Sequence, residues 1–183
     1  MSLYARTGDD GTTGRPGGRR VAKSDPLVRA NGAVDELNAH LGLCLVQAAD
    51  DGLAPVVEAL HRVQPELLAA GALLAAVGAD APTGVSLDDD AVTRMERQIG
   101  EIASSLPELT SFVLPRGTEL SCRLHVARTV CRRAERVVVA AAQARADVPP
   151  VVLKHLNRLS DLLFALARLA LHAAGQEDAP WRH

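Results

Sequence analysis

Aromatic residues are scarce in this sequence: its 183 residues include two Phe, one Tyr and one Trp, although 48% of the chain is hydrophobic. Strands favour aromatic and β-branched side chains, so this shortage argues against a β-sandwich or a barrel. A core built from Ala, Leu and Val suits closely packed helices instead. The apolar content also argues against disorder, and the length predicts a single domain.

An excess of one charge sign is also missing, because 20 Lys and Arg oppose 22 Asp and Glu. This balance gives no general attraction to nucleic acid or to an anionic membrane, so we expect neither as a partner. The sequence contains no apolar run of about 18 residues and no apolar N-terminal stretch of the signal-peptide kind. We therefore expect a soluble, cytoplasmic protein that binds any polyanion through a local cluster.

Cysteines are few, odd in number and without CxxC spacing: Cys44, Cys122 and Cys131. We predict reduced core residues and not a disulfide or metal framework. A di-iron carboxylate site would need two Glu-x-x-His pairs, and the sequence has only the pair formed by Glu58 and His61. We therefore assign no protein side chain to a metal.

Apolar residues recur at alternating spacings of three and four, which predicts five helices. The expected helices cover about 26–48, 53–77, 88–103 and 117–141, with a fifth after Pro149-Pro150 that reaches about residue 173. Asp25 followed by Pro26 predicts the start of the first helix. The short connections indicate an all-α fold, a five-helix antiparallel bundle. Within the single domain 1–183, we expect a loop at 1–23, the bundle at about 25–174 and a tail at 175–183.

Polar residues form lines beside three of the apolar stripes. On the fourth expected helix, Arg128, Arg132 and Glu135 are spaced i, i+4, i+7 and share one face. Guanidinium groups at this spacing suit phosphate oxygens, although a solvated basic face is the alternative. Similar lines lie on the first helix (Asn31, Asp35, Asn38) and on the fifth (Asn157, Asp161, Phe164, Arg168). They indicate a site between helices, a subunit contact or ordinary surface stripes.

The glycine-rich segment GDDGTTGR near the N-terminus looks superficially like a phosphate loop. It lacks the GK[ST] ending and a preceding apolar strand, which excludes a Walker A loop. Its threonine hydroxyls and five nearby cations could still cradle a polyphosphate. The two interpretations are an ordered or ligand-ordered binding loop and a disordered tail.

Phe112 lies in a connection, within SFVLPRG, and not on a helical core stripe. The ring either staples this connection onto the fourth helix or forms an apolar plug in a binding site.

In their order and spacing, the segments YARTGDDGTTG, VDELNAHLG, FVLPRGTELSCRLHVARTVCRRAERVV and LNRLSDLLFALAR resemble the PduO-type ATP:cob(I)alamin adenosyltransferase family over nearly the whole chain. The resemblance implies a trimer of five-helix bundles with active sites at the subunit interfaces. It implies transfer of the 5′-deoxyadenosyl group of ATP to cob(I)alamin, which gives adenosylcobalamin and triphosphate after four-coordinate cob(II)alamin has formed.

The resemblance also implies site residues and partners. ATP would be bound by two sets of residues, Arg6, Thr7, Gly8, Asp9, Gly11, Thr13 and Lys23 in the loop and Arg132, Glu135 and Asn157 on the helices. Cobalamin would be bound by Phe112, with Asp35 and Arg128 as a pair that bridges neighbouring subunits. Mg²⁺ is expected on the ATP phosphates, and a flavin or other reductase and an adenosylcobalamin-dependent enzyme are the implied protein partners.

Two other functions are compatible with the sequence. A corrinoid escort would bind cobalamin and deliver it to a dependent enzyme without efficient catalysis. A purely structural helical oligomer would leave the motifs unexplained.

Overall fold

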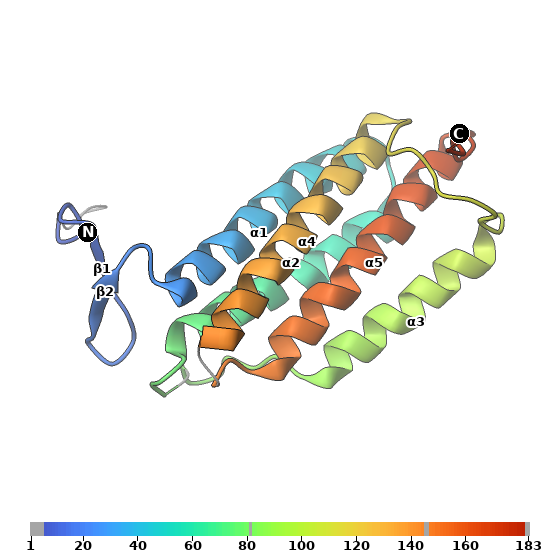
Figure 1. Cartoon of the computed structure of the whole chain (residues 1–183). Helices are drawn as coiled ribbons and strands as arrows, with labels where there is room; N and C mark the ends of the chain where they lie inside the picture. Colours follow the sequence, from blue (N-terminus) through green and yellow to red (C-terminus); the bar gives the residue numbers. More distant parts are fainter. Residues whose placement is uncertain (1–5, 81, 145–146, 182–183) are drawn as a thin grey trace.

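The five expected helices are present in the computed structural model, which describes residues 6–80, 82–144 and 147–181 (Figure 1). The elements are β1 (Thr12–Gly14), β2 (Arg20–Ala22), α1 (Pro26–Asp50), α2 (Ala54–Ala76), α3 (Asp89–Ser105), α4 (Glu119–Ala144) and α5 (Pro150–Ala173). Tyr4 and Ala5, in the expected ATP loop, and His183, in the expected tail, lie outside the described residues.

The helix starts follow the capping residues that the sequence predicts. The carboxylate of Asp25 accepts from the backbone N–H of Leu27 at 2.9 Å, and Pro26 occupies the first helical position. Asp88 caps α3 in the same way by accepting from the backbone N–H of Ala91 at 3.2 Å. Pro150 is the first residue of α5. Proline suits this position because the backbone N–H groups of the first helical turn have no partner within the helix, so the N–H that proline lacks is not missed.

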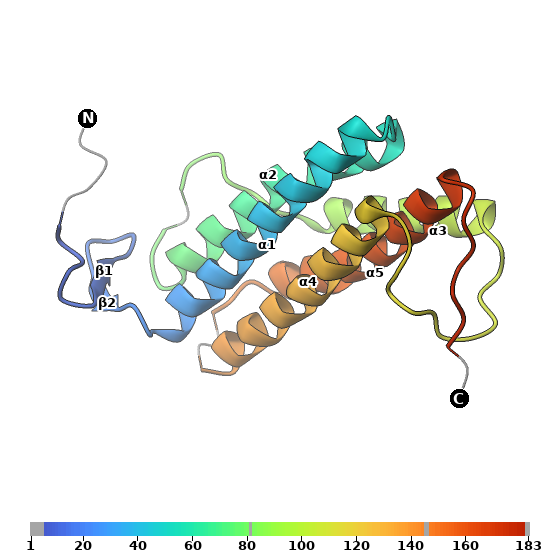
Figure 2. The ribbon, with the colours of Figure 1, turned by 90° about the horizontal axis from the view of Figure 1, so that it is seen from above.

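The helices pack so that α1 contacts both α2 and α4, α5 contacts α4, and α3 lies against α5 (Figures 1 and 2). The stripes that defined the helices face inward, and the largest fully buried side chains are almost all leucines. Within the described ranges, no helix is both long enough and apolar enough to span a bilayer.

The cysteines support the prediction of core residues. Cys44 and Cys131 are buried free thiols, and Cys122 is a half-buried free thiol. Burial raises the pKa of Cys44 to about 11 and that of Cys131 to about 12. The thiols of Cys44 and Cys131 therefore stay protonated and belong to the packed interior, whereas Cys122 lies at its edge.

The glycine-rich N-terminal segment forms a small antiparallel hairpin, so the disordered-tail interpretation is wrong for residues 6–23. Thr12 pairs with Ala22 and Thr13 with Val21, and Gly17 and Gly18 reverse the chain with φ of 82° and 75°. The turn requires backbone angles in the left-handed region, which glycine adopts without strain. Among the described residues, β1 and β2 form the only sheet of an otherwise mainly helical fold.

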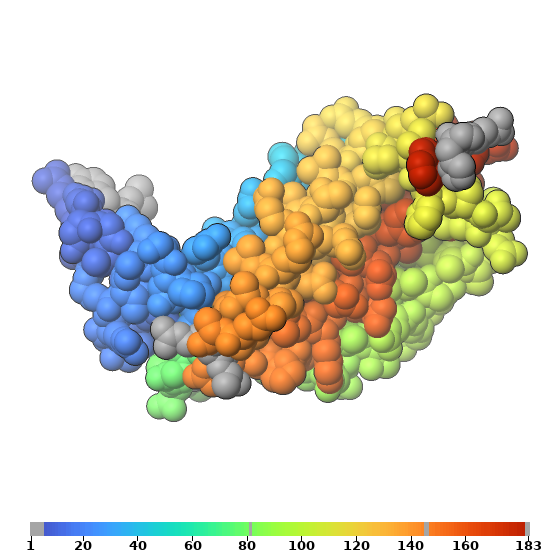
Figure 3. All heavy atoms as spheres, in the orientation of Figure 1, coloured from blue at the N-terminus to red at the C-terminus, as the bar shows by residue number. Residues whose placement is uncertain are grey.

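The hairpin and the connection between α3 and α4 lie at opposite ends of the bundle. The hairpin projects beyond the start of α1, whereas residues 106–118 and the C-terminal segment lie at the other end (Figures 1, 2 and 3). Because α4 has 26 residues, the helix between these ends is about 39 Å long.

Candidate functional site

Two adjoining cavities lie along the seam between α4 and α5. A cavity of about 280 Å³ is lined by the apolar side of α3, by Arg128 and Arg132 of α4, and by Asp161 and Phe164 of α5. A second, of about 590 Å³, is lined by residues 109–113 and by His125, Arg128 and Phe164. Because both contain Leu109, Arg128 and Phe164, we treat them as one site, the α4–α5 groove. The polar lines of α4 and α5 therefore meet in one site.

Arg128 lies at the centre of this groove and is half-buried. Its guanidinium carbon lies 6.0 Å from the centroid of the Phe164 ring, at the limit of a cation–π contact. Burial, together with the nearby charge of Arg132, lowers the pKa of the guanidinium. Its buried Nε has no hydrogen-bond partner in the part of the chain that the structure describes. A desolvated cation with an unused donor suits an anionic or polar ligand.

Arg132, Glu135 and Asn157 extend the site toward the hairpin end of the bundle. Arg132 is exposed one helical turn beyond Arg128 and lines the smaller cavity. Asn157 of α5 donates to Oε1 of Glu135 on α4 at 2.9 Å. The spacing from Arg128 to Glu135 corresponds to about 10 Å along α4. Arg132 therefore shares the cavity with Arg128, and the Glu135–Asn157 pair lies further along the same seam between α4 and α5.

The Phe112 ring is not packed onto α4, so the staple interpretation is wrong. It is 80% exposed and lines the larger cavity. A large apolar ring that is left in solvent at the mouth of a groove is available to a ligand.

The hairpin holds the remaining predicted loop residues at the far end of the bundle. A Cβ on Gly8 would meet the Thr12 carbonyl oxygen at 3.2 Å and Lys23 Nζ at 3.4 Å, so the Lys23 amine lies over Gly8. The backbone N–H of Lys23 donates to the carbonyl of Gly11 at 2.9 Å, and Gly11 has a φ of 80°. This closes the loop into a compact, amide-rich turn with a cation beside it.

The other loop residues are exposed on the same hairpin or form its strands. Arg6, Thr7 and Asp9 are exposed, and Thr13 is half-buried in β1. The Thr7 carbonyl accepts from Arg20. These residues are gathered near Lys23 but are separate from the α4–α5 groove.

Asp35 is not brought to Arg128 within one chain. It lines a different cavity, of about 360 Å³, between α1 and α2, with Asn31 and Asn38 of the same polar line. Within one chain the predicted site residues therefore form three groups: the groove, the hairpin and the α1–α2 cavity.

No group of three or more His, Cys, Asp or Glu side chains gathers to hold a metal ion, among the residues that the structure describes.

Residues 3–170 match the sequence profile of a family described as cobalamin adenosyltransferase. The chain belongs to this family.

Individual cobalamin and corrinoid adenosyltransferases agree over most of the chain. The chain is 41% identical to the cobalamin adenosyltransferase of Cupriavidus metallidurans, over 98% of this chain and 94% of that protein. It is 41% identical to the corrinoid adenosyltransferase PduO of Salmonella typhimurium, over 92% of this chain but 49% of that longer protein. A variant of the PduO-type ATP:corrinoid adenosyltransferase from Lactobacillus reuteri, complexed with cobalamin and ATP, superposes with a TM-score of 0.90 at 32% identity, over all of both chains. This likeness confirms the predicted fold.

Two residues of this cobalamin adenosyltransferase line or border the groove although the sequence did not assign them to it. His125 is 6% exposed, with its ring centroid 6.0 Å from that of Phe164. It lies one turn before Arg128, a spacing that could have indicated a shared face. Trp181, which the sequence placed in a tail, has its ring centroid 6.5 Å from that of Phe112. No local pattern in the sequence connects residues so far apart.

Proposed function

We propose that this protein transfers the 5′-deoxyadenosyl group of ATP to the cobalt of a reduced corrinoid and releases inorganic triphosphate. Family membership supports this, as does the likeness to an enzyme solved with cobalamin and ATP. The observation that carries the proposal is the α4–α5 groove, where apolar walls from α3 and Phe164 lie beside Arg128 and Arg132. An apolar macrocycle and an anionic nucleotide need such neighbouring surfaces.

In the proposed reaction, the electron pair of Co(I) forms the cobalt–carbon bond to C5′ of ATP. The bond from C5′ to the triphosphate oxygen breaks, and its electron pair leaves with triphosphate. No side chain has to act as a nucleophile, so the protein mainly aligns the two substrates, which can supply several kcal/mol. Arg132 and Lys23 would stabilise the charge that grows on the leaving group.

Magnesium fits this site as an ion that ATP carries. Mg²⁺ keeps several waters and is commonly held by substrate phosphates with few protein ligands. Magnesium would supply charge neutralisation on the phosphates.

Phe112 would act on the corrinoid before reduction. Cob(II)alamin is hard to reduce while an axial ligand donates electron density into the cobalt orbital that must accept the electron. An apolar ring against the lower face would exclude water and the dimethylbenzimidazole group, which leaves four-coordinate cobalt. The exposure of Phe112 at the groove is consistent with this role.

A second copy of the chain would complete the site. The hairpin and the Phe112 segment lie at opposite ends of one bundle, so the ATP loop of one subunit would serve the groove of the next in a trimer (Figure 1). Asp35 would then pair with the partner subunit's Arg128. Exposed apolar side chains on the outer faces of the helices support such contacts; they are Leu43, Val46, Leu68, Val126 and Val139.

The decisive experiment is an anaerobic assay. Protein, chemically reduced cobalamin and Mg-ATP are mixed, and adenosylcobalamin absorbance is followed together with triphosphate release. We expect one triphosphate for each adenosylcobalamin. Corrinoid binding without product would overturn the transferase and leave the escort function, and no binding of either substrate would overturn both. Light scattering on the same sample tests the trimer.

A further inference from the structure

The last described residues do not form a loose tail but pair with the segment that carries Phe112. The backbone N–H of Trp181 donates to the carbonyl of Phe112 at 2.8 Å, and that of Leu114 donates to the carbonyl of Ala179 at 2.8 Å. Val113 and Pro180 form an antiparallel bridge between these two bonds. We call residues 176–181 the C-terminal strap. It holds the backbone on both sides of Val113.

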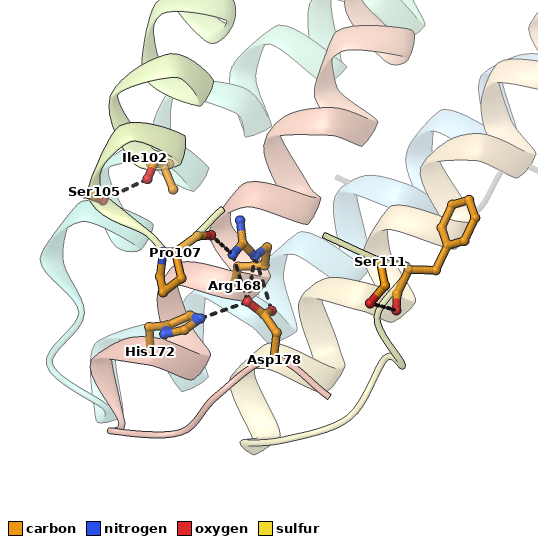
Figure 4. A network of polar contacts seen from close by, with 8 residues as sticks. Ile102, Ser105, Pro107, Ser111, Arg168, His172 and Asp178 are labelled. Atoms are coloured by element: carbon orange, nitrogen blue, oxygen red, sulfur yellow. Dashed lines mark hydrogen bonds and ion pairs between the residues drawn. The ribbon is translucent and has the colours of Figure 1, made fainter. Parts of the chain in front are cut away.

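Asp178 anchors this strap to α5 (Figure 4). Its carboxylate accepts from Nε of Arg168 at 3.0 Å, from Nη2 of Arg168 at 2.8 Å and makes a contact of 2.9 Å with Nε2 of His172. Burial by itself raises the pKa of Asp178, but the hydrogen bonds from Arg168 and His172 outweigh it and lower the pKa below its usual value. Asp178 is therefore an ionised anchor, bound at three points.

Arg168 connects the strap to the other end of the same segment. Its side chain is only 8% exposed, and its Nη2 also donates to the carbonyl of Pro107 at 2.7 Å. One buried guanidinium thus joins α5, the strap and the beginning of the α3–α4 connection (Figure 4). Removing the Asp178 charge would leave this cation buried without its partner.

The Phe112 side chain has little packing of its own to hold it. Its ring is 80% exposed, and the ring of Trp181, on the strap, is its described aromatic neighbour. The position of the ring therefore depends on the backbone bonds and on the strap that makes them.

We propose that Asp178 and Arg168 are positioning residues for Phe112, and that the C-terminal strap fixes the Phe112 ring at the mouth of the α4–α5 groove. The inference rests on the proposed function, because it gives the strap a role in shaping the corrinoid site. A merely structural role for the Asp178–Arg168 pair would lower stability without favouring one cobalt oxidation state over the other.

The test compares the isosteric change Asp178→Asn with Glu177→Gln, which removes the same charge from the adjacent exposed residue. Trp181 is the only tryptophan in the chain, so its fluorescence quenching by acrylamide reports strap release without any substrate. We expect greater quenching for Asp178→Asn, wild-type behaviour for Glu177→Gln and partial recovery for Asp178→Glu.

The second readout is the ratio of two activities. Displacing a group by about 1 Å can cost about 100-fold, so we expect Asp178→Asn to lose about 10- to 100-fold in conversion from cob(II)alamin with a chemical reductant. Conversion from pre-reduced cob(I)alamin should change by less than about threefold, because that form needs no help with reduction. The electron paramagnetic resonance signal of four-coordinate cob(II)alamin with ATP should weaken in the same variant.

A pair of variants covers the case in which Asp178→Asn does not fold. Trp181→Pro removes the N–H that binds the Phe112 carbonyl, whereas Trp181→Ala keeps it, and neither touches Asp178. We expect the greater loss of cob(II)alamin conversion in Trp181→Pro.

Unchanged quenching in Asp178→Asn, or equal losses from both cobalt oxidation states, would overturn the positioning role. Failure of the proposed function looks different, since the wild-type protein itself would then make no adenosylcobalamin.

Discussion

The side-chain amide of Asn157 on α5 donates a hydrogen bond of 2.9 Å to the Glu135 carboxylate on α4. An ionised carboxylate can only accept hydrogen bonds, so the Asn157 amide must turn its nitrogen toward Glu135. The amide oxygen of Asn157 is then left as an acceptor for another group. A typical hydrogen bond contributes only about 0.5–1.5 kcal/mol to the free energy of unfolding. Because Asn157 is exposed, this bond adds little to stability. The pair is better suited to orienting a ligand donor, such as a nucleoside hydroxyl or amino group, than to holding the helices together.

Glu135→Gln should weaken ATP binding while the fold survives. Glutamine can donate as well as accept, so the Asn157 amide loses its fixed orientation. We expect the KM for ATP to rise by about 3- to 10-fold, equivalent to about 1 kcal/mol, with little change in the melting temperature. Steady-state kinetics and thermal unfolding measure both. Glu96→Gln is the matched control, since Glu96 is an exposed carboxylate that accepts from Arg158 on α5 at 3.1 Å; an equal effect there would contradict a specific role.

Arg15→Ala should loosen the hairpin without unfolding the bundle. Arg15 donates to the carbonyls of Ala75 and Val77 at 3.2 and 2.6 Å, at the end of α2, where helical carbonyls lack partners. Losing this tether should speed hydrogen exchange in residues 6–23 and raise the KM for ATP, while the KM for cobalamin stays the same. Arg19→Ala removes an exposed cation from the same hairpin as a control. If both variants behave alike, net charge and not tethering is responsible.

Arg132→Ala should weaken the use of ATP. Arg132 is exposed in the groove one turn from Arg128, where a guanidinium can bind phosphate oxygens with two donors. We expect kcat/KM for ATP to fall by at least about tenfold, a loss of about 1.4 kcal/mol. Arg132→Lys should recover only part of it, because an ammonium lacks the planar fork. Arg97→Ala serves as a control on the exposed face of α3, and unchanged ATP kinetics in Arg132→Ala would remove the assignment.

Phe112→Ala should slow conversion from cob(II)alamin more than conversion from pre-reduced cob(I)alamin. The ring is needed only while an axial ligand must be kept off the cobalt before reduction. Parallel anaerobic assays with the two starting oxidation states give the ratio. Leu114→Ala is the control, because Leu114 is also an exposed apolar residue of this segment. Equal losses from both starting states would argue against the plug mechanism.

The helices could be predicted from the sequence because the information for them is local. The 3,4 spacing of Leu and Ala defined the buried faces, and Asp25, Pro26 and Asp88 marked starts that the structure confirms. The hairpin was harder, since two three-residue strands carry little periodicity and Gly17 and Gly18 are compatible with a turn or with disorder.

The candidate site could be predicted from helix spacing and from the family resemblance, which adds Phe112 to the groove residues of α4 and α5. Arg128, Arg132 and Glu135 follow from spacing, whereas Asp178 with Arg168 and Trp181 with Phe112 meet through the tertiary fold. The spacing of His125 from Arg128 is compatible with a shared helix face, but nothing in the sequence indicates that this histidine is buried.

The stability of the protein should fall when the pH is lowered from 7.5 to 5, and His125 should account for part of the fall. Burial, together with the charge of Arg128, lowers the pKa of His125 to about 4 from its usual 6.5, although Asp178 acts in the opposite direction. Below pH 6.5, His125 therefore binds a proton in the unfolded chain, whereas in the folded chain it stays neutral down to about pH 4. The folded state loses stability across this window, by about 2 kcal/mol at pH 5.

Urea unfolding at pH 7.5 and pH 5 tests this prediction with two histidine variants. His125→Leu removes the titrating group, so its stability should depend less on pH than that of the wild type, whatever its stability at pH 7.5. His61→Leu changes an exposed histidine and should keep the wild-type dependence. If His125→Leu loses as much stability as the wild type between the two pH values, His125 does not stay neutral in the folded protein.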